Sequence, residues 1–160
     1  MKVIPRLSPL LVALPFCGAL PALHQPRAAT AASATVLSVE AESSADVLRG
    51  AAKIYACPPC SGGKIVRWIG FGGSLNMVLT LPRSGTYTLQ ISYTNGYGPR
   101  NAYVRVNFDV PARMTFASTP DWRTIRTHAF KAHLVAGLNH LAFTNPIGWC
   151  PDIDRVVVLR

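Results

Sequence analysis

The sequence predicts an all-β protein, a single jelly-roll-like antiparallel β-sandwich formed by residues 35–160. Several segments alternate apolar and polar residues with a period of two, as half-buried antiparallel strands do. Clusters of Gly, Pro and Asn separate these segments and indicate turns, and none of the segments carries an apolar stripe at helical spacing. Short strands at this spacing are typical of a β-sandwich.

Residues 1–34 have the pattern of a secretory signal peptide. Lys2 and Arg6 give a charged start, residues 7–23 are mostly apolar, and small residues fill 28–34. Three prolines interrupt the apolar run, which argues against a stable membrane-spanning helix. We therefore expect a secreted, extracellular protein that has no membrane association after cleavage.

The remaining domain is basic. Residues 35–160 keep 13 of the 16 basic residues and all seven acidic ones, for a net charge of +6. A basic extracellular protein attracts anions such as acidic polysaccharides and wall polymers. Stray nucleic acid is another such anion, but we expect no dedicated nucleic-acid partner, and the charges are scattered without a basic run. A dedicated anion site and an ordinary solvated surface both remain open.

Three central segments show the alternation most clearly. Residues 75–81 alternate Leu or Met with Asn, Val and Thr, and residues 86–93 alternate Tyr, Leu and Ile with Thr, Gln and Ser. Residues 101–108 place Ala, Val and Phe on one face and mostly polar side chains on the other. Each segment predicts a strand with one buried face. The turn signals fall at residues 82–85, 95–99, 136–139 and 145–148.

The two ends of the domain carry paired acids. Glu40 and Glu42 lie in the first predicted strand, and Asp152 and Asp154 lie at the start of the last one. Residues two apart on a strand project from the same face. If the first and last strands are neighbours, the carboxylates converge, and such a set of hard oxygen ligands suits calcium. Separately solvated acids at strand ends are the alternative.

Three cysteines, Cys57, Cys60 and Cys150, fall within the predicted domain. In an oxidising compartment two of them should pair. We expect a local Cys57–Cys60 disulfide, and a bridge from either of them to Cys150 is the alternative. The Ser-Gly-Gly at 61–63 argues against a redox motif, which needs a following helix, and the spacing does not match a zinc site.

Signatures of catalysis are weak. Asp121 and His128 could join a serine in a triad only on paper, because no nucleophile elbow is present. The glycine-rich residues 71–74 have no strand-to-helix context for binding phosphate. The paired acids are too close in sequence to flank a glycosidic bond from opposite sides. We therefore expect a protein that is not an enzyme.

A set of motifs occurs in a characteristic order from about residue 36 to residue 159. Each is loose alone, but the ordered set resembles a family 35 carbohydrate-binding module, within the wider group that includes family 6. It is most similar to modules attached to secreted glycosidases such as bacterial α-galactosidases. The motifs lie at residues 40–42, 57–70, 85–89, 121–124, 136–139 and 145–154.

The resemblance implies a sandwich with one structural calcium ion. The family's paired glutamates match Glu40 and Glu42, and the aspartate entering the last strand matches Asp154. Backbone carbonyls between residues 50 and 63 would complete the coordination shell. Asp152 is the weaker candidate ligand.

The resemblance also implies a sugar site in the loops at one end of the sandwich. The family's aromatic platform falls on Trp68 and its polar contact on Asn145, with Trp149 in the same loop. A ring for stacking and an amide for hydrogen bonds suit the apolar faces and hydroxyl rims of sugars. Tyr97 and Arg100, on a glycine-rich loop, are further candidates.

Core packing is the alternative for each tryptophan, and for Trp122 it is the expectation. We predict a secreted, monomeric, calcium-stabilised carbohydrate-binding protein for plant or cell-wall polysaccharide, galactosides or uronic-acid sugars. A free-standing module would act as a lectin, a wall-associated factor or the partner of a separately encoded glycoside hydrolase. The alternatives are a secreted interaction or structural protein and a small polysaccharide-active enzyme.

Overall fold

The computed structural model describes residues 34–160, and most of this part is β-strand, so the all-β prediction is confirmed. The predicted signal segment lies outside the described residues, apart from its last residue. Within 34–160, the one helical segment is a 3-10 turn at Ser61–Gly63, and nothing here is a helix long and apolar enough to cross a bilayer. The strands are β1 (Thr35–Glu40), β2 (Val47–Arg49), β3 (Lys53–Ala56), β4 (Lys64–Arg67), β5 (Ser74–Leu81), β6 (Gly85–Thr94), β7 (Arg100–Val106), β8 (Ala112–Phe116), β9 (Arg126–Leu134), β10 (Gly137–Thr144) and β11 (Asp152–Leu159).

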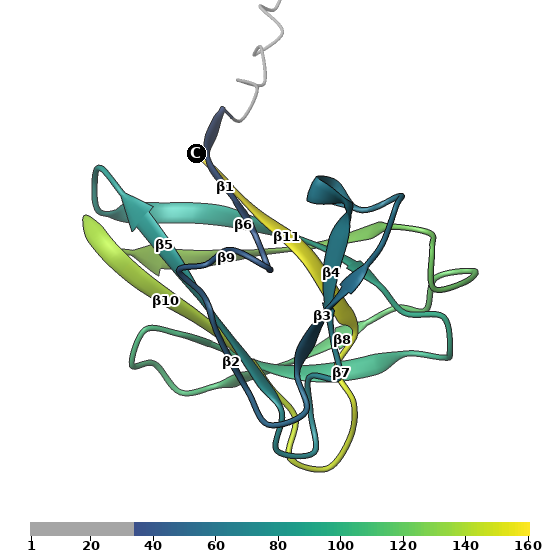
Figure 1. Ribbon diagram of the computed structural model, residues 1–160. Helices are drawn as coiled ribbons and strands as arrows, with labels where there is room; N and C mark the ends of the chain where they lie inside the picture. Colours follow the sequence, from purple (N-terminus) through teal and green to yellow (C-terminus); the bar gives the residue numbers. More distant parts are fainter. Residues whose placement is uncertain (1–33) are drawn as a thin grey trace, which may run out of the picture. The chain divides into compact units, whose positions relative to one another are not determined.

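The strands form two antiparallel sheets, which is the predicted sandwich (Figure 1). One sheet has the order β3-β4-β11-β6-β9, and β1 also pairs with β11; the other has the order β2-β5-β10-β7-β8. The first and last strands are therefore neighbours. Their outer ends meet where Ala34 and Arg160 exchange two backbone hydrogen bonds of 3.0 Å.

The core lies between the sheets and is filled by the inward faces of the alternating strands. Leu89 and Ile91 of β6 and Leu75 and Phe143 of the opposite sheet are fully buried in one cluster. The cluster consists of aliphatic, Phe, Tyr, Met, Ala and Cys side chains, and none of the tryptophans in the described part belongs to it. The tryptophans are therefore available for another purpose.

The predicted strand at 101–108 ends earlier than its alternation indicated. β7 stops at Val106, and Asn107 adopts a left-handed backbone conformation with a φ of 52°. The Asn107 side chain donates a hydrogen bond to Asn139 Oδ1, and its own Oδ1 accepts one from the His140 backbone. This turn leaves Phe108 almost fully exposed rather than buried.

One edge of β11 is shared by two strands. β1 pairs with residues 155–159 of β11, whereas β4 pairs with Ile153. On the opposite edge, the register with β6 shifts between Ile153 and Arg155. Asp154 therefore lies at a bulge where β11 changes partner, and bulges redirect side chains.

The predicted Cys57–Cys60 disulfide is confirmed, and Cys150 is a free, buried cysteine. The alternative bridge to Cys150 is therefore wrong. Burial raises the pKa of the Cys150 thiol to about 12, so this thiol is unreactive near neutral pH. Backbone hydrogen bonds from Cys57 to Gly63 and from Gly63 to Cys60 tie the disulfide to the 3-10 turn.

The strand alternation predicts which leucines carry the fold. Leu89→Ala removes a fully buried side chain from β6 and should lower the free energy of unfolding by about 2–5 kcal/mol. Leu138→Ala, at a position that is 64% exposed, should change it by less than about 0.5 kcal/mol. Urea unfolding curves of the two variants measure this, and equal losses would contradict the described packing.

Candidate functional site

The loop between β4 and β5 (residues 68–73) and the loop between β10 and β11 (residues 145–151) lie side by side at one end of the sandwich (Figure 1). Phe71 donates a backbone hydrogen bond to Asn145, and Cys150 donates one to Ile69, each 2.8 Å long. The two loops approach each other closely at Gly70, where an added Cβ would collide with the Gly148 carbonyl oxygen. Its φ of 123° also favours glycine. The two loops are thus fixed to one another through their backbones.

A cavity of about 160 Å³ opens beside these loops. All three tryptophans of the chain line it, together with a tyrosine, two arginines and one aspartate. The lining residues are Arg67, Trp68, Tyr97, Arg100, Trp122, Trp149 and Asp152. We call it the aromatic cavity.

The aromatic rings hold one another edge to face. The ring centroids of Trp68 and Trp149 are 5.3 Å apart, and those of Tyr97 and Trp122 are 5.7 Å apart. Trp68 is 45% exposed and has a left-handed backbone with a φ of 62°. Its indole Nε1 donates a 3.0 Å hydrogen bond to the Tyr55 hydroxyl. These contacts fix the orientation of the rings before any ligand binds.

Positive charge dominates the polar part of the aromatic cavity. The Arg100 guanidinium lies 4.6 Å from the Trp122 ring centroid and donates a hydrogen bond to the Cys150 carbonyl. Arg67 Nε lies 2.8 Å from Asp152 Oδ2. Burial raises the pKa of Asp152 to about 6, and the charges of Arg67 and Arg100 oppose this rise. Two guanidinium groups therefore face one weakly acidic carboxyl group.

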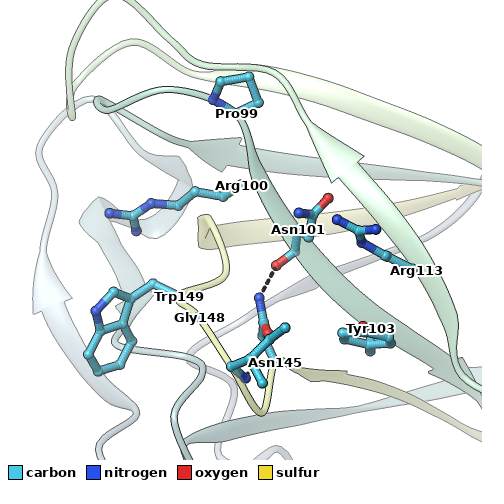
Figure 2. A pocket seen from close by; sticks show the side chains of 9 residues that line it. Pro99, Arg100, Asn101, Tyr103, Arg113, Asn145, Gly148 and Trp149 are labelled. Carbon is cyan, nitrogen blue, oxygen red and sulfur yellow. Dashed lines mark hydrogen bonds between the residues drawn. The ribbon is translucent and has the colours of Figure 1, made fainter.

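A second cavity, of about 290 Å³, adjoins the first and shares Arg100 and Trp149 with it (Figure 2). Asn145 lies in its wall and is nearly fully buried. The Asn145 Nδ2 atom donates to the Asn101 carbonyl at 2.8 Å, and its Oδ1 accepts from the Ile147 backbone at 3.2 Å. Asn145 therefore shapes the 145–150 loop, and direct contact with a sugar stays a prediction.

A separate group of carboxylates surrounds the 3-10 turn. Glu40 Oε1 accepts a 2.7 Å hydrogen bond from the Ser61 hydroxyl, and the Ser61 backbone N–H also donates to Asp154. Four buried carboxylate oxygens here have no hydrogen-bond partner, one each from Glu40, Glu42, Asp46 and Asp154. Buried polar atoms without partners are costly and call for an explanation.

The electrostatics of this group show mutual repulsion. The pKa of Asp154 is raised to about 6, mainly by burial and next by the charge of Glu40, while Arg155 and the Ser61 N–H partly offset this. The pKa of Asp46 is also raised to about 6, again mainly by burial. A cation would relieve both the burial cost and the repulsion.

Glu42 reaches this group by a different route from the one predicted. β1 ends at Glu40, because Ser43 donates a backbone hydrogen bond to the Glu40 carbonyl and closes a turn. Glu42 therefore lies in the turn and not on a strand face. The absence of a side chain at Gly62 leaves room for it, since a Cβ there would come within 2.8 Å of Glu42 Oε1.

The donor set fits a hard cation, because unpartnered carboxylate oxygens are the ligands that calcium prefers. Within residues 34–160, however, no group of three or more Asp, Glu, His or Cys side chains is close enough together to hold a metal ion. An ion would have to draw Glu40, Glu42 and Asp154 closer together.

A scan against models of known protein families and a search of curated proteins each found no match. Among solved structures, a family 35 carbohydrate binding module from Clostridium thermocellum is 30% identical, with a TM-score of 0.76. The match covers 79% of this chain and 100% of that module. The chain belongs to family 35 of the carbohydrate-binding modules.

Two further structures share the fold of this module. A family 35 module from Paenibacillus barcinonensis is 20% identical, with a TM-score of 0.69, over 76% of this chain and 97% of that one. An exo-β-1,3-galactanase from Phanerochaete chrysosporium is 24% identical, with a TM-score of 0.72. That match covers 78% of this chain and 29% of the galactanase.

Four of the five predicted ligand residues meet in the aromatic cavity of the module: Trp68, Tyr97, Arg100 and Trp149. Asn145 lies in the adjoining cavity. Their roles in binding remain predictions, but the structure brings them to one end of the sandwich.

Sequence reasoning missed three residues of this cavity. Trp122 was expected in the core and is only half-buried, because Asp121 accepts backbone hydrogen bonds from Arg123 and Thr124 and folds a loop that holds Trp122 against Tyr97. The Asp-Trp motif was the available signal. The other two are Arg67 and Asp152, whose ion pair follows from the pairing of β4 with β11.

The contact at Gly70 predicts how the module responds to a single added methyl group. Gly70→Ala should lower the free energy of unfolding by about 2 kcal/mol or more, because strain and a backbone collision add. Gly72→Ala is the matched control, since Gly72 also has a positive φ but faces open space. Chemical unfolding of both variants measures the difference, and equal losses would show that the loops are not in contact as described.

Proposed function

We propose that this module binds acidic polysaccharide by taking a uronic-acid ring into the aromatic cavity. One observation carries the proposal: all three tryptophans of the chain line one small cavity that also holds two arginines. Sugar rings present apolar C–H faces that stack on indole rings. The core of the described domain is filled without tryptophan, so packing needs do not explain this gathering.

Charge supports an acidic sugar over a neutral one. Arg67 and Arg100 together outweigh Asp152, which pairs with Arg67 and leaves the Arg100 charge without a carboxylate partner of its own in the cavity. Guanidinium groups bind carboxylates through paired, charge-assisted hydrogen bonds. At about 160 Å³, the cavity is smaller than the roughly 300–1,000 Å³ of typical small-molecule sites. Its size therefore suits one sugar ring.

The same lining supports binding without catalysis. Asp152 is the one carboxylate among the residues that line the aromatic cavity, and it is paired with Arg67. Glycoside hydrolysis in most families needs two carboxylates on opposite sides of the bond. The Cys57–Cys60 disulfide supports the further proposal that the module is exported, because disulfides persist in oxidising compartments.

We also propose a structural calcium ion held by Glu40, Glu42 and Asp154. Their unpartnered buried oxygens are the supporting observation, and calcium would supply the missing positive charge. The three residues come from the end of β1, the following turn and the bulge of β11. Asp46 adds a fourth unpartnered oxygen near Glu42. An ion here would join the two ends of the domain.

The aromatic cavity predicts that single tryptophan substitutions weaken binding. Trp122→Ala and Trp149→Ala should each reduce the affinity for galacturonic acid at least about fivefold, because a stacked ring contributes around 1 kcal/mol beyond its buried area. Phe108→Ala removes an aromatic ring that is 99% exposed elsewhere and should have no effect. Isothermal titration calorimetry measures all three, and parental affinity in both tryptophan variants would place the site elsewhere.

The two arginines predict a preference for charge that depends on salt. Galacturonic acid should bind more tightly than galactose, and the difference should shrink as the salt concentration rises from 50 to about 500 mM, since ions screen partly exposed charges. Titrations of both sugars at the two salt concentrations test this. Equal affinity for the two sugars at low salt would contradict the acidic preference and leave sugar binding itself intact.

The carboxylate group predicts stabilisation by calcium. Millimolar calcium should raise the melting temperature of the chelator-treated protein by several degrees, because an ion that binds only the folded state stabilises it. Asp154→Asn should abolish most of this shift. Asp109→Asn, at an exposed acid outside the group, should leave it unchanged. A melting temperature that is the same with calcium and with chelator would refute the site.

A further inference from the structure

The second cavity is the feature that the proposed function leaves unused. We propose that it is a second subsite for the next acidic sugar of the same chain, so that the module recognises two or more consecutive uronic-acid residues. This inference rests on the proposed function. The first observation behind it is adjacency: Arg100 and Trp149 line both cavities, so the two cavities lie next to each other and a chain that occupies both would pass over these two side chains.

The floor of the second cavity is built on strands. Asn101 and Tyr103 of β7 and Arg113 of β8 line it, and Tyr103 is the register partner of Arg113. Their neighbours Ala102 and Val104 are buried in the core, which holds β7 in place with its other face outward. Figure 2 shows Arg113 and Tyr103 on one side of the cavity and Arg100 and Trp149 on the other.

The polar groups of this floor are mutually ordered. Asn101 uses its carbonyl oxygen to hold Asn145 and its Oδ1 to accept a 2.8 Å hydrogen bond from Thr115. Arg113 is exposed, and it takes part in no ion pair with the carboxylates of residues 34–160. Its N–H groups are therefore free to donate hydrogen bonds to a ligand. Tyr103, its register partner on β7, lines the same cavity.

The distribution of arginines over the two cavities favours a polymer in which every sugar ring is acidic. Arg67 and Arg100 face the aromatic cavity, and Arg100 and Arg113 face the second one. Each cavity thus offers cationic donors together with an aromatic ring, which matches a carboxylate and an apolar face on each successive sugar. A carboxylate on the next sugar can pair with Arg113, whereas a neutral sugar gains no such contact, so we assign a polyuronate as the ligand class.

The test is the dependence of affinity on oligosaccharide length. Isothermal titration calorimetry with galacturonic acid and with its α-1,4-linked dimer and trimer, at one ionic strength, should show at least about tenfold tighter binding of the dimer and trimer than of the single sugar. Arg113→Ala should remove most of this gain and leave the affinity for the single sugar unchanged, because charge-assisted hydrogen bonds to Arg113 are lost only in the second cavity.

Arg105→Ala is the matched control. Arg105 is an exposed arginine on the same outward face of β7 but does not line the cavity, so its removal subtracts the same charge. Equal losses in the two arginine variants would reduce the effect to general attraction and overturn the second subsite. Binding of the trimer no tighter than the single sugar would overturn it as well, while the proposed function stands. Absence of binding at all three lengths would overturn both.

Discussion

The shared edge of β11 is the constraint on which the rest of this module depends. Because β1 pairs with residues 155–159 and β4 with Ile153, β11 must change partner at Asp154, and it bulges there. The bulge brings Asp154 to the carboxylate group at the 3-10 turn. β4 and β11 pair at Val66 and Ile153, and the adjacent residues, Arg67 on β4 and Asp152 on β11, form the ion pair in the aromatic cavity. Two sites of different chemistry thus depend on one strand.

The core contains Tyr and Phe side chains, whereas the tryptophans lie in loops. Tyr87, Phe116 and Phe143 fill the space between the sheets, so every tryptophan can stand in loops at one end. The loops of Trp68 and Trp149 are joined by backbone hydrogen bonds, and the Trp122 ring packs against Tyr97. The rings are therefore already ordered before a ligand binds. A preordered site loses less conformational entropy on binding than a flexible one.

Sequence patterns predicted the sandwich well because strand alternation is a local signal. The Cys57–Cys60 disulfide was also predicted correctly from the sequence, whereas the pairing of the first and last strands was only a condition of the calcium hypothesis, and the structure meets it. Sequence patterns failed where geometry depends on contacts distant in sequence. Neither the ion pair of Arg67 with Asp152 nor the packing of Trp122 against Tyr97 has a local signature, because each joins residues at least 25 positions apart. The prediction that Phe108 is buried was wrong for a related reason, because a turn held by the Asn107–Asn139 hydrogen bond follows the end of β7.

The most direct test of the account is an NMR titration with galacturonic acid that follows the indole N–H signals. The chain has three tryptophans, and all of them line the aromatic cavity, whereas only Trp149 also lines the second one, so a ligand in the aromatic cavity should move all three signals. We predict that all three shift in a saturable manner with one common dissociation constant. Saturable shifts of backbone signals elsewhere, with the three indole signals unmoved, would contradict a sugar site in this cavity.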